Sequence, residues 1–154
     1  MEEYFEEEIF LMSIRPKYAE AIFRGRKRYE LRKLSGLPPI PEGSVIVVYS
    51  SGKVKKIIGE FRVGRVIIDV PERLWPVVSR PGLGIGQDAY AYIRGSKRAM
   101  ALEVRDPRLY PRPVSLEEIR RIIPGWMPPF SYKRLVPGDR VYELIVRPLR
   151  ESLH

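Results

Sequence analysis

Hydrophobic and polar positions change their spacing along the chain, and each spacing predicts a different element. Nearly continuous apolar runs at 9–14 (IFLMSI) and 45–51 (VIVVYSS) are typical of strands, and the β-branched second run predicts a buried central strand. Between these runs, apolar residues recur at the spacing of a helix that packs one face on a core. Pro16 suits the first turn of this helix, and Gly25 suits its end in a left-handed conformation.

The rest of the chain continues without a regular strand–helix–strand rhythm. Its predicted elements are one or two strands within 57–70, short helices within 71–95, strands at 98–105 and 141–147, an extended segment at 107–114 and a capped helix at 115–123. Gly59 and Gly64 fall where bulges would bend a sheet. We therefore predict an α+β fold around a small, strongly bent sheet or β-barrel of about six strands with flanking short helices.

The length of 154 residues suits a single domain with one core. Five of the 19 acidic residues fall within an acidic N-terminal arm, 1–8, and we expect the domain at 9–154. The arm either stays solvated or folds back over a basic region of the domain. The oligomeric state stays open, with a monomer as the simpler expectation.

The charge balance points to a polyanionic partner. Lys and Arg number 28 against 19 Asp and Glu, which gives a net charge of +9. Such a chain attracts nucleic acid first and an anionic membrane second, although a generic basic surface gives the same count. No apolar run approaches the roughly 18 residues that cross a bilayer, and the acidic start is the opposite of a signal peptide's basic start. We therefore expect a cytoplasmic protein that does not bind membranes.

The composition narrows the chemistry. There is no Cys and the only His is His154, so we expect no disulfide, no metal site and no catalytic His. Acid–base catalysis would fall to Glu, Asp, Lys or Tyr, and we expect no cofactor. Thr and Asn are absent and Gln occurs once, which is typical of thermophilic proteins, although the excess of Arg over Lys can also reflect genome composition.

A basic unit at 13–34 (SIRPKYAEAIFRGRKRYELRKL) is the first candidate site. Beyond its glycine the pattern alternates, so Arg28, Glu30 and Arg32 should share the face of a strand opposite the core. Glu30 would then lie between two guanidinium groups. It would be either part of a salt-bridged, exposed strand face or a carboxylate of lowered pKa that accepts hydrogen bonds from a ligand. Lys27 falls on the other parity and reaches Glu30 only if the bend after the glycine swings it round.

Two loops are further candidates. In the first, Ser50, Ser51 and Lys53 flank a glycine in an arrangement that either holds a phosphate or forms a plain hairpin turn. The second, 125–135 (GWMPPFSYKRL), mixes aromatic residues with cations as base-stacking surfaces do. The alternative for this loop is that its aromatic side packs on the core.

Four of these residues carry a resemblance to a known family. Gly25, Lys27, Glu30 and Arg32 match the signature of the ASCH domain, a branch of the PUA-like superfamily: a strand, a proline and a helix, then Gly, any residue, Lys, two residues, Glu, any residue and Arg. The segments YSS, GEF, a GI-initiated helix and PPFSY are similar to those of archaeal members. The likeness therefore spans residues 11–146.

The resemblance implies a PUA-like β-barrel that binds RNA or a nucleotide in a cleft beside the barrel, in RNA metabolism or transcription-linked regulation. It also implies an alternative, since one bacterial branch hydrolyses acetylcytidine with a Lys, Thr and Glu set and another resembles a ribonuclease. Lys27 would match the catalytic lysine, but Glu30 stands at the threonine position and 79–86 holds no carboxylate. A binding module is therefore the favoured hypothesis. In an enzyme, either an amidohydrolase or a ribonuclease, Lys27 and Glu30 would be catalytic.

The expected nucleic-acid contacts come from the basic unit and the two loops: Lys17, Arg26, Lys27, Arg28, Glu30, Arg32, Ser50, Ser51, Lys53, Trp126, Phe130, Tyr132 and Lys133. In this hypothesis the cations contact phosphate, Glu30 accepts hydrogen bonds from a base or sugar, and the aromatic loop covers or stacks the base.

Overall fold

A computed structural model describes residues 7–34 and 36–154. Most of the predicted acidic arm therefore lies outside the described residues. Of its described members, Glu7 forms ion pairs with Arg62 and Arg150, both at 3.4 Å, and Glu8 lies 3.7 Å from Arg134. These contacts hold the end of the arm away from the basic unit.

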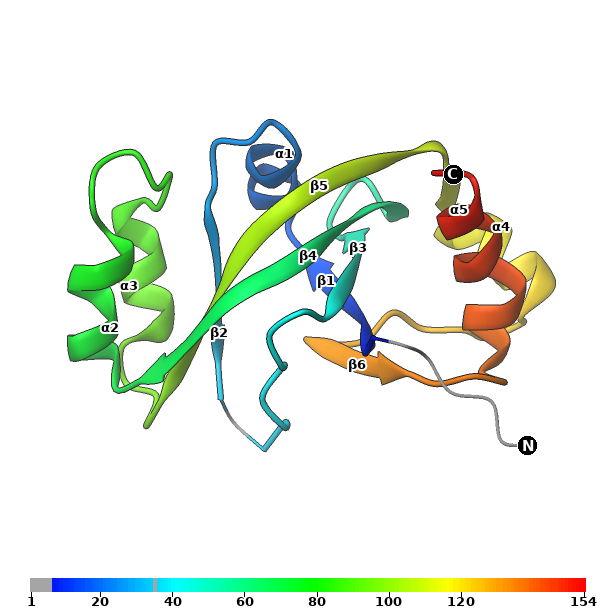
Figure 1. The fold of residues 1–154 in the computed structure, drawn as a ribbon. Coiled ribbons are helices and arrows are strands. Elements are labelled where there is room, and N and C mark those ends of the chain that lie inside the picture. The colour runs from blue at the N-terminus through cyan, green and yellow to red at the C-terminus, as the bar shows by residue number, and fades with distance from the viewer. Residues whose placement is uncertain (1–6, 35) are drawn as a thin grey trace.

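Six strands form one strongly curled sheet (Figure 1): β1 Ile9–Ile14, β2 Tyr29–Lys33, β3 Val45–Ser50, β4 Lys56–Asp69, β5 Ala99–Ser115 and β6 Tyr132–Leu135. Their order across the sheet is β2-β5-β4-β3-β1-β6. β1 and β3 run parallel, while the other neighbouring pairs are antiparallel. In the parallel pair Ile14 lies opposite Ser50, so both strands end at the same edge of the sheet.

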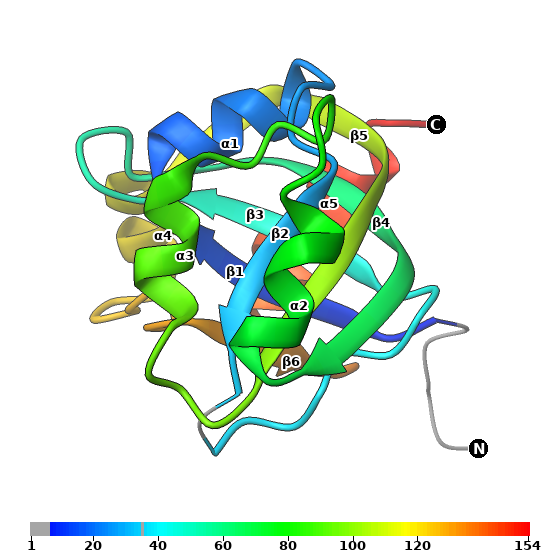
Figure 2. The same cartoon turned by 90° about the vertical axis from the view of Figure 1, so that its left-hand side faces the viewer.

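Short helical segments surround the sheet (Figure 2): α1 Pro16–Phe23, α2 Pro71–Val78, α3 Gln87–Ile93, α4 Leu116–Ile122, a π-helical turn η1 Tyr142–Val146 and α5 Arg147–Glu151. α1 lies over β3 and β5, and α2 and α3 stand together against β2, β4 and β5. α4 and α5 contact β5 and lie at the opposite side of the molecule from α2 and α3 (Figure 1).

Three apolar clusters make up the core, one for each group of helices. The cluster below α1 lies inside the curl of the sheet and includes Phe10 and Phe61. A second, beneath α2 and α3, includes Leu74, and a third, against α4 and the C-terminal helices, includes Tyr110 and Ile145. Because each fully buried Leu, Ile or Phe side chain contributes roughly 1.5–3 kcal/mol, these faces hold the short helices on the sheet.

The curl comes from irregular pairing between β4 and β5. Their register shifts between Ile57 and Gly59, between Glu60 and Arg62, and between Val63 and Val66. The first shift lies at Gly59 and the last spans Gly64, which confirms the predicted bulges. A Cβ at Gly59 would lie 2.4 Å from the carbonyl oxygen of Arg108 and 2.7 Å from the Phe23 ring. Only glycine fits at this close approach of backbone to backbone.

The predicted final strand at 141–147 is wrong. This segment forms η1 and runs directly into α5. Its aromatic and β-branched residues suggested a strand, but Val141, Ile145 and Leu149 are buried at helical spacing. Burial of this helical face outweighs the local preference for a strand, because strand propensity depends strongly on packing context.

The predicted α+β class and the strongly bent sheet of about six strands are confirmed. The sheet is a half-barrel, since its outer strands β2 and β6 do not pair with each other within the described residues. No helix in that part of the chain is long and apolar enough to span a membrane.

Candidate functional site

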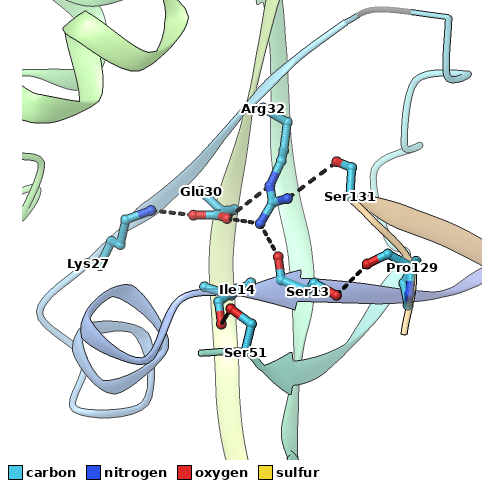
Figure 3. Close-up of polar contacts among 8 residues, drawn as sticks. All are labelled: Ser13, Ile14, Lys27, Glu30, Arg32, Ser51, Pro129 and Ser131. Carbon is cyan, nitrogen blue, oxygen red and sulfur yellow. Dashed lines mark hydrogen bonds and ion pairs between the residues drawn. The ribbon is translucent and has the colours of Figure 1, made fainter. Parts of the chain in front are cut away.

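A buried cluster of charged side chains lies at the centre of the candidate site (Figure 3). Lys27 Nζ donates a hydrogen bond to Glu30 Oε1, and Arg32 donates to Glu30 Oε2 from Nε at 3.1 Å and from Nη2 at 2.7 Å. The residues Lys27, Glu30 and Arg32 are 6%, 4% and 8% exposed. We call this cluster the charged triad.

The turn after α1 brings Lys27 into the triad. Gly25 has a φ of 75°, and the backbone N–H groups of Gly25 and Arg26 donate to the carbonyl oxygens of Ile22 and Ala21 at 3.0 and 2.9 Å. This pair of bonds is a Schellman motif, which ends a helix through a left-handed residue. The predicted bend is therefore present, and it lets Lys27 face the rest of the triad.

Arg28 does not join the triad, which corrects one expectation. Its side chain is exposed, and its backbone N–H donates to the carbonyl oxygen of Leu83 at 2.9 Å. Strand alternation does not apply to Arg28 because β2 begins one residue later, at Tyr29. Glu30 consequently lies between one ammonium and one guanidinium group, not between two guanidinium groups.

The guanidinium of Arg32 also ties the triad to two other strands. Its Nη2 donates to the carbonyl oxygen of Ser13 at 2.7 Å, and its Nη1 donates to Ser131 Oγ at 3.3 Å. Ser13 in turn donates from Oγ to the carbonyl oxygen of Pro129 at 2.6 Å and from its backbone N–H to that of Ser131 at 3.0 Å. The triad thus fixes the end of β1 against the start of β6 (Figure 3).

The charge of Glu30 is strongly stabilised. Burial by itself raises the pKa of this carboxyl, but the attraction of Lys27 and Arg32 and their hydrogen bonds outweigh burial and hold the pKa below its usual range. Both carboxylate oxygens are occupied by donors. Glu30 is therefore poorly suited to accept a proton, and the site favours its role as a fixed anion over the role of a catalytic base.

Polar residues of α1 and α3 cover the outer side of Lys27. Its Nζ lies 5.4 Å from the centroid of the Tyr18 ring, and the Tyr18 hydroxyl donates to Asp88. That hydrogen bond, together with partial burial, raises the pKa of Tyr18 to about 12. The predicted contacts Lys17 and Arg26 are both exposed, and Lys17 lies 3.9 Å from Asp88.

The predicted serine–lysine turn lies next to the start of α1. The backbone N–H of Ser51 donates to the carbonyl oxygen of Ile14 at 2.9 Å, and a Cβ at Gly52 would lie 3.5 Å from Pro16. Ser50 is buried within β3, whereas Lys53 is exposed. The residue before Pro16, Arg15, is exposed as well; it lay inside the basic unit but was not among the predicted contacts.

The three aromatic residues of the second candidate loop differ in their burial and contacts. Trp126 packs on the core and meets the Tyr49 ring edge-on, with centroids 6.3 Å apart. Tyr132 is buried and donates from its hydroxyl to the carbonyl oxygen of Pro38 at 2.7 Å. Phe130 is 105% exposed. The loop is therefore only partly folded onto the core, and Phe130 alone of the three presents a free ring.

A basic groove of about 580 Å³ lies between the turn after β3 and α4. Its cations include the predicted Lys53 together with Lys55, Arg120 and Arg121. Sequence reasoning missed the last two because α4 was interpreted only as a capped helix. The remaining predicted contact, Lys133, is exposed on β6.

A second buried carboxylate belongs to a different cluster. Glu60 Oε1 accepts hydrogen bonds from the Tyr110 hydroxyl and from Arg150 Nε, both at 3.0 Å, and Arg150 also reaches Glu7 at 3.4 Å. We call Glu60, Tyr110, Arg150 and Glu7 the distant network. The described residues hold no group of three or more His, Cys, Asp or Glu side chains suited to bind a metal.

Comparison with known proteins identifies the family. No family model matches the chain. A curated relative, an ASCH domain-containing ribonuclease of Zymomonas mobilis, is 28% identical over 121 residues, which cover 79% of this chain and 80% of the relative. A solved tyrosine-to-phenylalanine mutant of the ASCH protein of the same organism has a TM-score of 0.68 and 27% identity and covers 82% of this chain and 89% of its own.

The chain belongs to the ASCH domain family. The unmutated Zymomonas mobilis ASCH structure shares this fold, with a TM-score of 0.72 and 23% identity over 94% of this chain and 92% of its own. The N-terminal domain of Staphylothermus marinus McrB has a TM-score of 0.54 and 17% identity, covering 96% of this chain and 98% of its own, and therefore shares the general fold. The archaeal and thermophilic assignments stay predictions, as does the role of each site residue.

Proposed function

We propose that this ASCH protein binds RNA on the surface that surrounds the carboxyl end of β1. We call it the β1-end surface and define it by Arg15, Lys17, Lys53, Phe130 and Ser131. The observation that carries the proposal is the meeting of exposed cations from separate segments beside a triad whose only anion is already neutralised. The ribonuclease name of the Zymomonas mobilis relative supports RNA as the polyanion.

The electrostatics of this surface favour phosphate. Within the triad, Lys27 and Arg32 outnumber Glu30, so the buried cluster adds a net positive charge beneath the surface. Arg15 and Lys53 form no ion pair among the residues that the structure describes, so both remain available to phosphate oxygens. Neutralising phosphates releases counterions, which gives RNA binding its affinity and its dependence on salt.

The triad itself acts mainly by positioning in this proposal. Its three side chains are nearly inaccessible, so they leave little surface for a ligand. The Arg32 guanidinium instead holds Ser13 and Ser131 in place, and these residues flank Arg15 and Phe130 in sequence. Buried charge pairs of this kind fix a local geometry even where their net contribution to stability is small.

The experiment that tests RNA binding compares two double variants of equal charge. The double variant Arg15→Ala with Lys53→Ala removes cations from the β1-end surface. The control, Arg73→Ala with Arg140→Ala, removes one exposed cation from α2 and one from the segment that follows β6. Binding of a fluorescein-labelled, mixed-sequence single-stranded RNA is followed by anisotropy at several salt concentrations. We expect the first variant to bind at least about tenfold more weakly and to reduce the salt slope by about 1.4.

Two results would overturn this proposal. One is a wild-type protein that does not bind RNA at physiological salt. The other is an equal loss in both double variants, which would mean that only net charge matters. The control variant therefore separates a defined surface from a generally basic protein.

RNA cleavage is a second candidate, favoured by the name of the relative. Attack by a ribose 2′-hydroxyl needs a proton acceptor. Glu30 and Glu60 are both occupied by hydrogen-bond donors, so neither is placed for this role. Incubating the same RNA with wild-type protein and with both double variants tests cleavage on a denaturing gel. Products that appear equally with all three proteins would indicate a contaminating ribonuclease, and they would exclude RNA cleavage at the β1-end surface.

A further inference from the structure

We propose that Phe130 is a stacking platform for one unpaired base, so that the RNA on the β1-end surface is single-stranded where it meets this residue. The inference rests on the proposed RNA binding and narrows its substrate class. It makes Phe130 a direct contact with the ligand, in contrast to the two other aromatic residues of its loop.

The exposure of Phe130 is the first observation. At 105% it is the most exposed of the large hydrophobic side chains in the described part of the chain. Single exposed apolar residues are common on protein surfaces and by themselves indicate nothing. Trp126 and Tyr132, however, show that neighbouring rings of the same loop could be packed or hydrogen-bonded, and Phe130 is not.

The second observation is that the backbone on both sides of Phe130 is held. The carbonyl oxygen of Pro129 accepts a hydrogen bond from Ser13 Oγ at 2.6 Å, and that of Ser131 accepts one from the Ser13 N–H at 3.0 Å. Arg32 donates to Ser131 Oγ at 3.3 Å, and two consecutive prolines restrict the chain before the ring. A ring on a fixed backbone loses little conformational entropy when a ligand covers it.

The third observation is that the segments carrying Arg15 and Lys53 meet at the end of β1 to which the backbone around Phe130 is tied. The residue next to Phe130, Ser131, is hydrogen-bonded to Ser13, which lies two residues before Arg15. The backbone N–H of Ser51 donates to the carbonyl oxygen of Ile14, and Ser51 begins the turn that carries Lys53. An aromatic face next to unpaired cations is the arrangement that stacks a base while its backbone phosphates are neutralised. A protein partner recognised by a lone phenylalanine would not require these cations.

The class of RNA follows from which face of a base is free. In a duplex the base faces are stacked on their neighbours, and only the edges are accessible in the grooves. In single-stranded RNA the faces can open onto an aromatic side chain. Stacking on Phe130 is therefore available to single-stranded segments, loops and ends, but not to the interior of a duplex.

The test uses Phe130→Ala and Phe130→Tyr, with Leu144→Ala as the matched control. Leu144 is an exposed apolar residue on η1, beyond the opposite end of β6. Each protein is titrated with a single-stranded RNA and with a blunt-ended duplex of two annealed strands of the same length, which contains no loop. The single-stranded RNA carries one 2-aminopurine, whose fluorescence falls when it stacks on an aromatic ring.

We expect Phe130→Ala to weaken binding of the single strand about tenfold and to remove the 2-aminopurine quenching, because stacking on one aromatic residue supports a loss of that order. Phe130→Tyr should keep both, and Leu144→Ala should change neither. The much weaker binding of the duplex should be the same for all four proteins, with an unchanged salt slope.

Several outcomes would overturn the inference. They are an unchanged single-strand affinity in Phe130→Ala, an equal loss for single strand and duplex, or a change of oligomeric state in Phe130→Ala, which would show that the ring packs on a second copy. If the wild-type protein still binds RNA through Arg15 and Lys53 in these cases, only the stacking role fails. If the wild type binds neither RNA, the proposed function fails as well.

Discussion

The charged triad and the distant network both bury a glutamate among cations, but they are assembled in opposite ways. Lys27, Glu30 and Arg32 lie within six consecutive residues and are brought together by one turn and one strand. The distant network joins residues that lie 50 and 90 positions away from Glu60. The first borders exposed cations at the end of β1, whereas the second fastens the C-terminal helix to β4.

Burial separates the two clusters further. All three members of the triad are nearly inaccessible, so each depends on the others. The side chain of Arg150 is 18% exposed and has Glu7 as an additional partner. Removing one charged side chain from the triad should therefore leave the remaining ions buried and unpaired. Removing one from the distant network should leave Arg150 partly solvated. Three variants test this contrast.

The largest effect is expected from Glu30→Ala. It leaves the ammonium of Lys27 and the guanidinium of Arg32 buried without their anion, and breaking a buried pair in this way costs about 3–5 kcal/mol. The free energy of unfolding, from guanidinium chloride titration, measures the loss. The control Glu20→Ala removes an exposed partner of Arg24 and should cost less than about 0.5 kcal/mol.

Acidification checks the cause of this loss. The pKa of Glu30, raised by burial but lowered further by Lys27 and Arg32, lies below the ordinary 4.5. The stability that Glu30 contributes is therefore fully present above about pH 4.5 and is lost as the pH falls through the lowered folded-state pKa. Wild-type protein should lose stability in that window, and Glu30→Ala should lose less there. Parallel acid profiles would show that Glu30 is not held as a charged group.

Glu60→Ala is expected to cost less, about 1–3 kcal/mol, because Arg150 keeps Glu7 and water while the Tyr110 hydroxyl loses its acceptor. Denaturant unfolding of Glu60→Ala, Tyr110→Phe and the double variant gives the coupling between the two side chains. If Glu60→Ala lowered the free energy of unfolding as much as Glu30→Ala does, the two clusters would not differ in this respect. RNA affinity should stay unchanged in all three variants.

The smallest effect is expected from Gly25→Ala, about 1 kcal/mol. The added Cβ meets nothing within 4 Å, so the cost is only the strain of a positive φ. Gly95→Ala is the matched control, since Gly95 has a φ of 87° and equally open surroundings. Both variants should lose similar stability, but only Gly25→Ala should weaken RNA binding by a few fold, because its turn carries Lys27. Equal RNA affinities would contradict that link.

The contrast between the clusters also explains what the sequence could predict. The bend after Gly25 and the shared face of Glu30 and Arg32 depend on local rules, so both were predictable. The exclusion of Arg28 was not, because it depends on the residue at which β2 begins. The distant network left no local signal, since the partners of Glu60 lie 50 and 90 positions away in the sequence.

The incorrectly predicted strand shows the same limit. The segment at 141–147 is rich in strand-forming residues, and only the core that receives Val141 and Ile145 makes it helical. Within the aromatic loop, likewise, the sequence suggested a common role for three rings. Tertiary packing separates Phe130 from the other two, and that packing is set by strands far away in the chain.

The parallel pairing of β1 and β3 has a consequence for how recognition could diversify. Because Ile14 and Ser50 lie side by side, two chain segments that are distant in sequence leave the sheet at one edge. β1 leads through Arg15 directly into α1, whereas β3 leads into the turn at 51–55. A turn of this kind can be lengthened, shortened or exchanged without disturbing the strands below it. Exchanging the turn after β3 while keeping α1 after β1 would then be a practical route to proteins that share this scaffold but present different side chains at this edge.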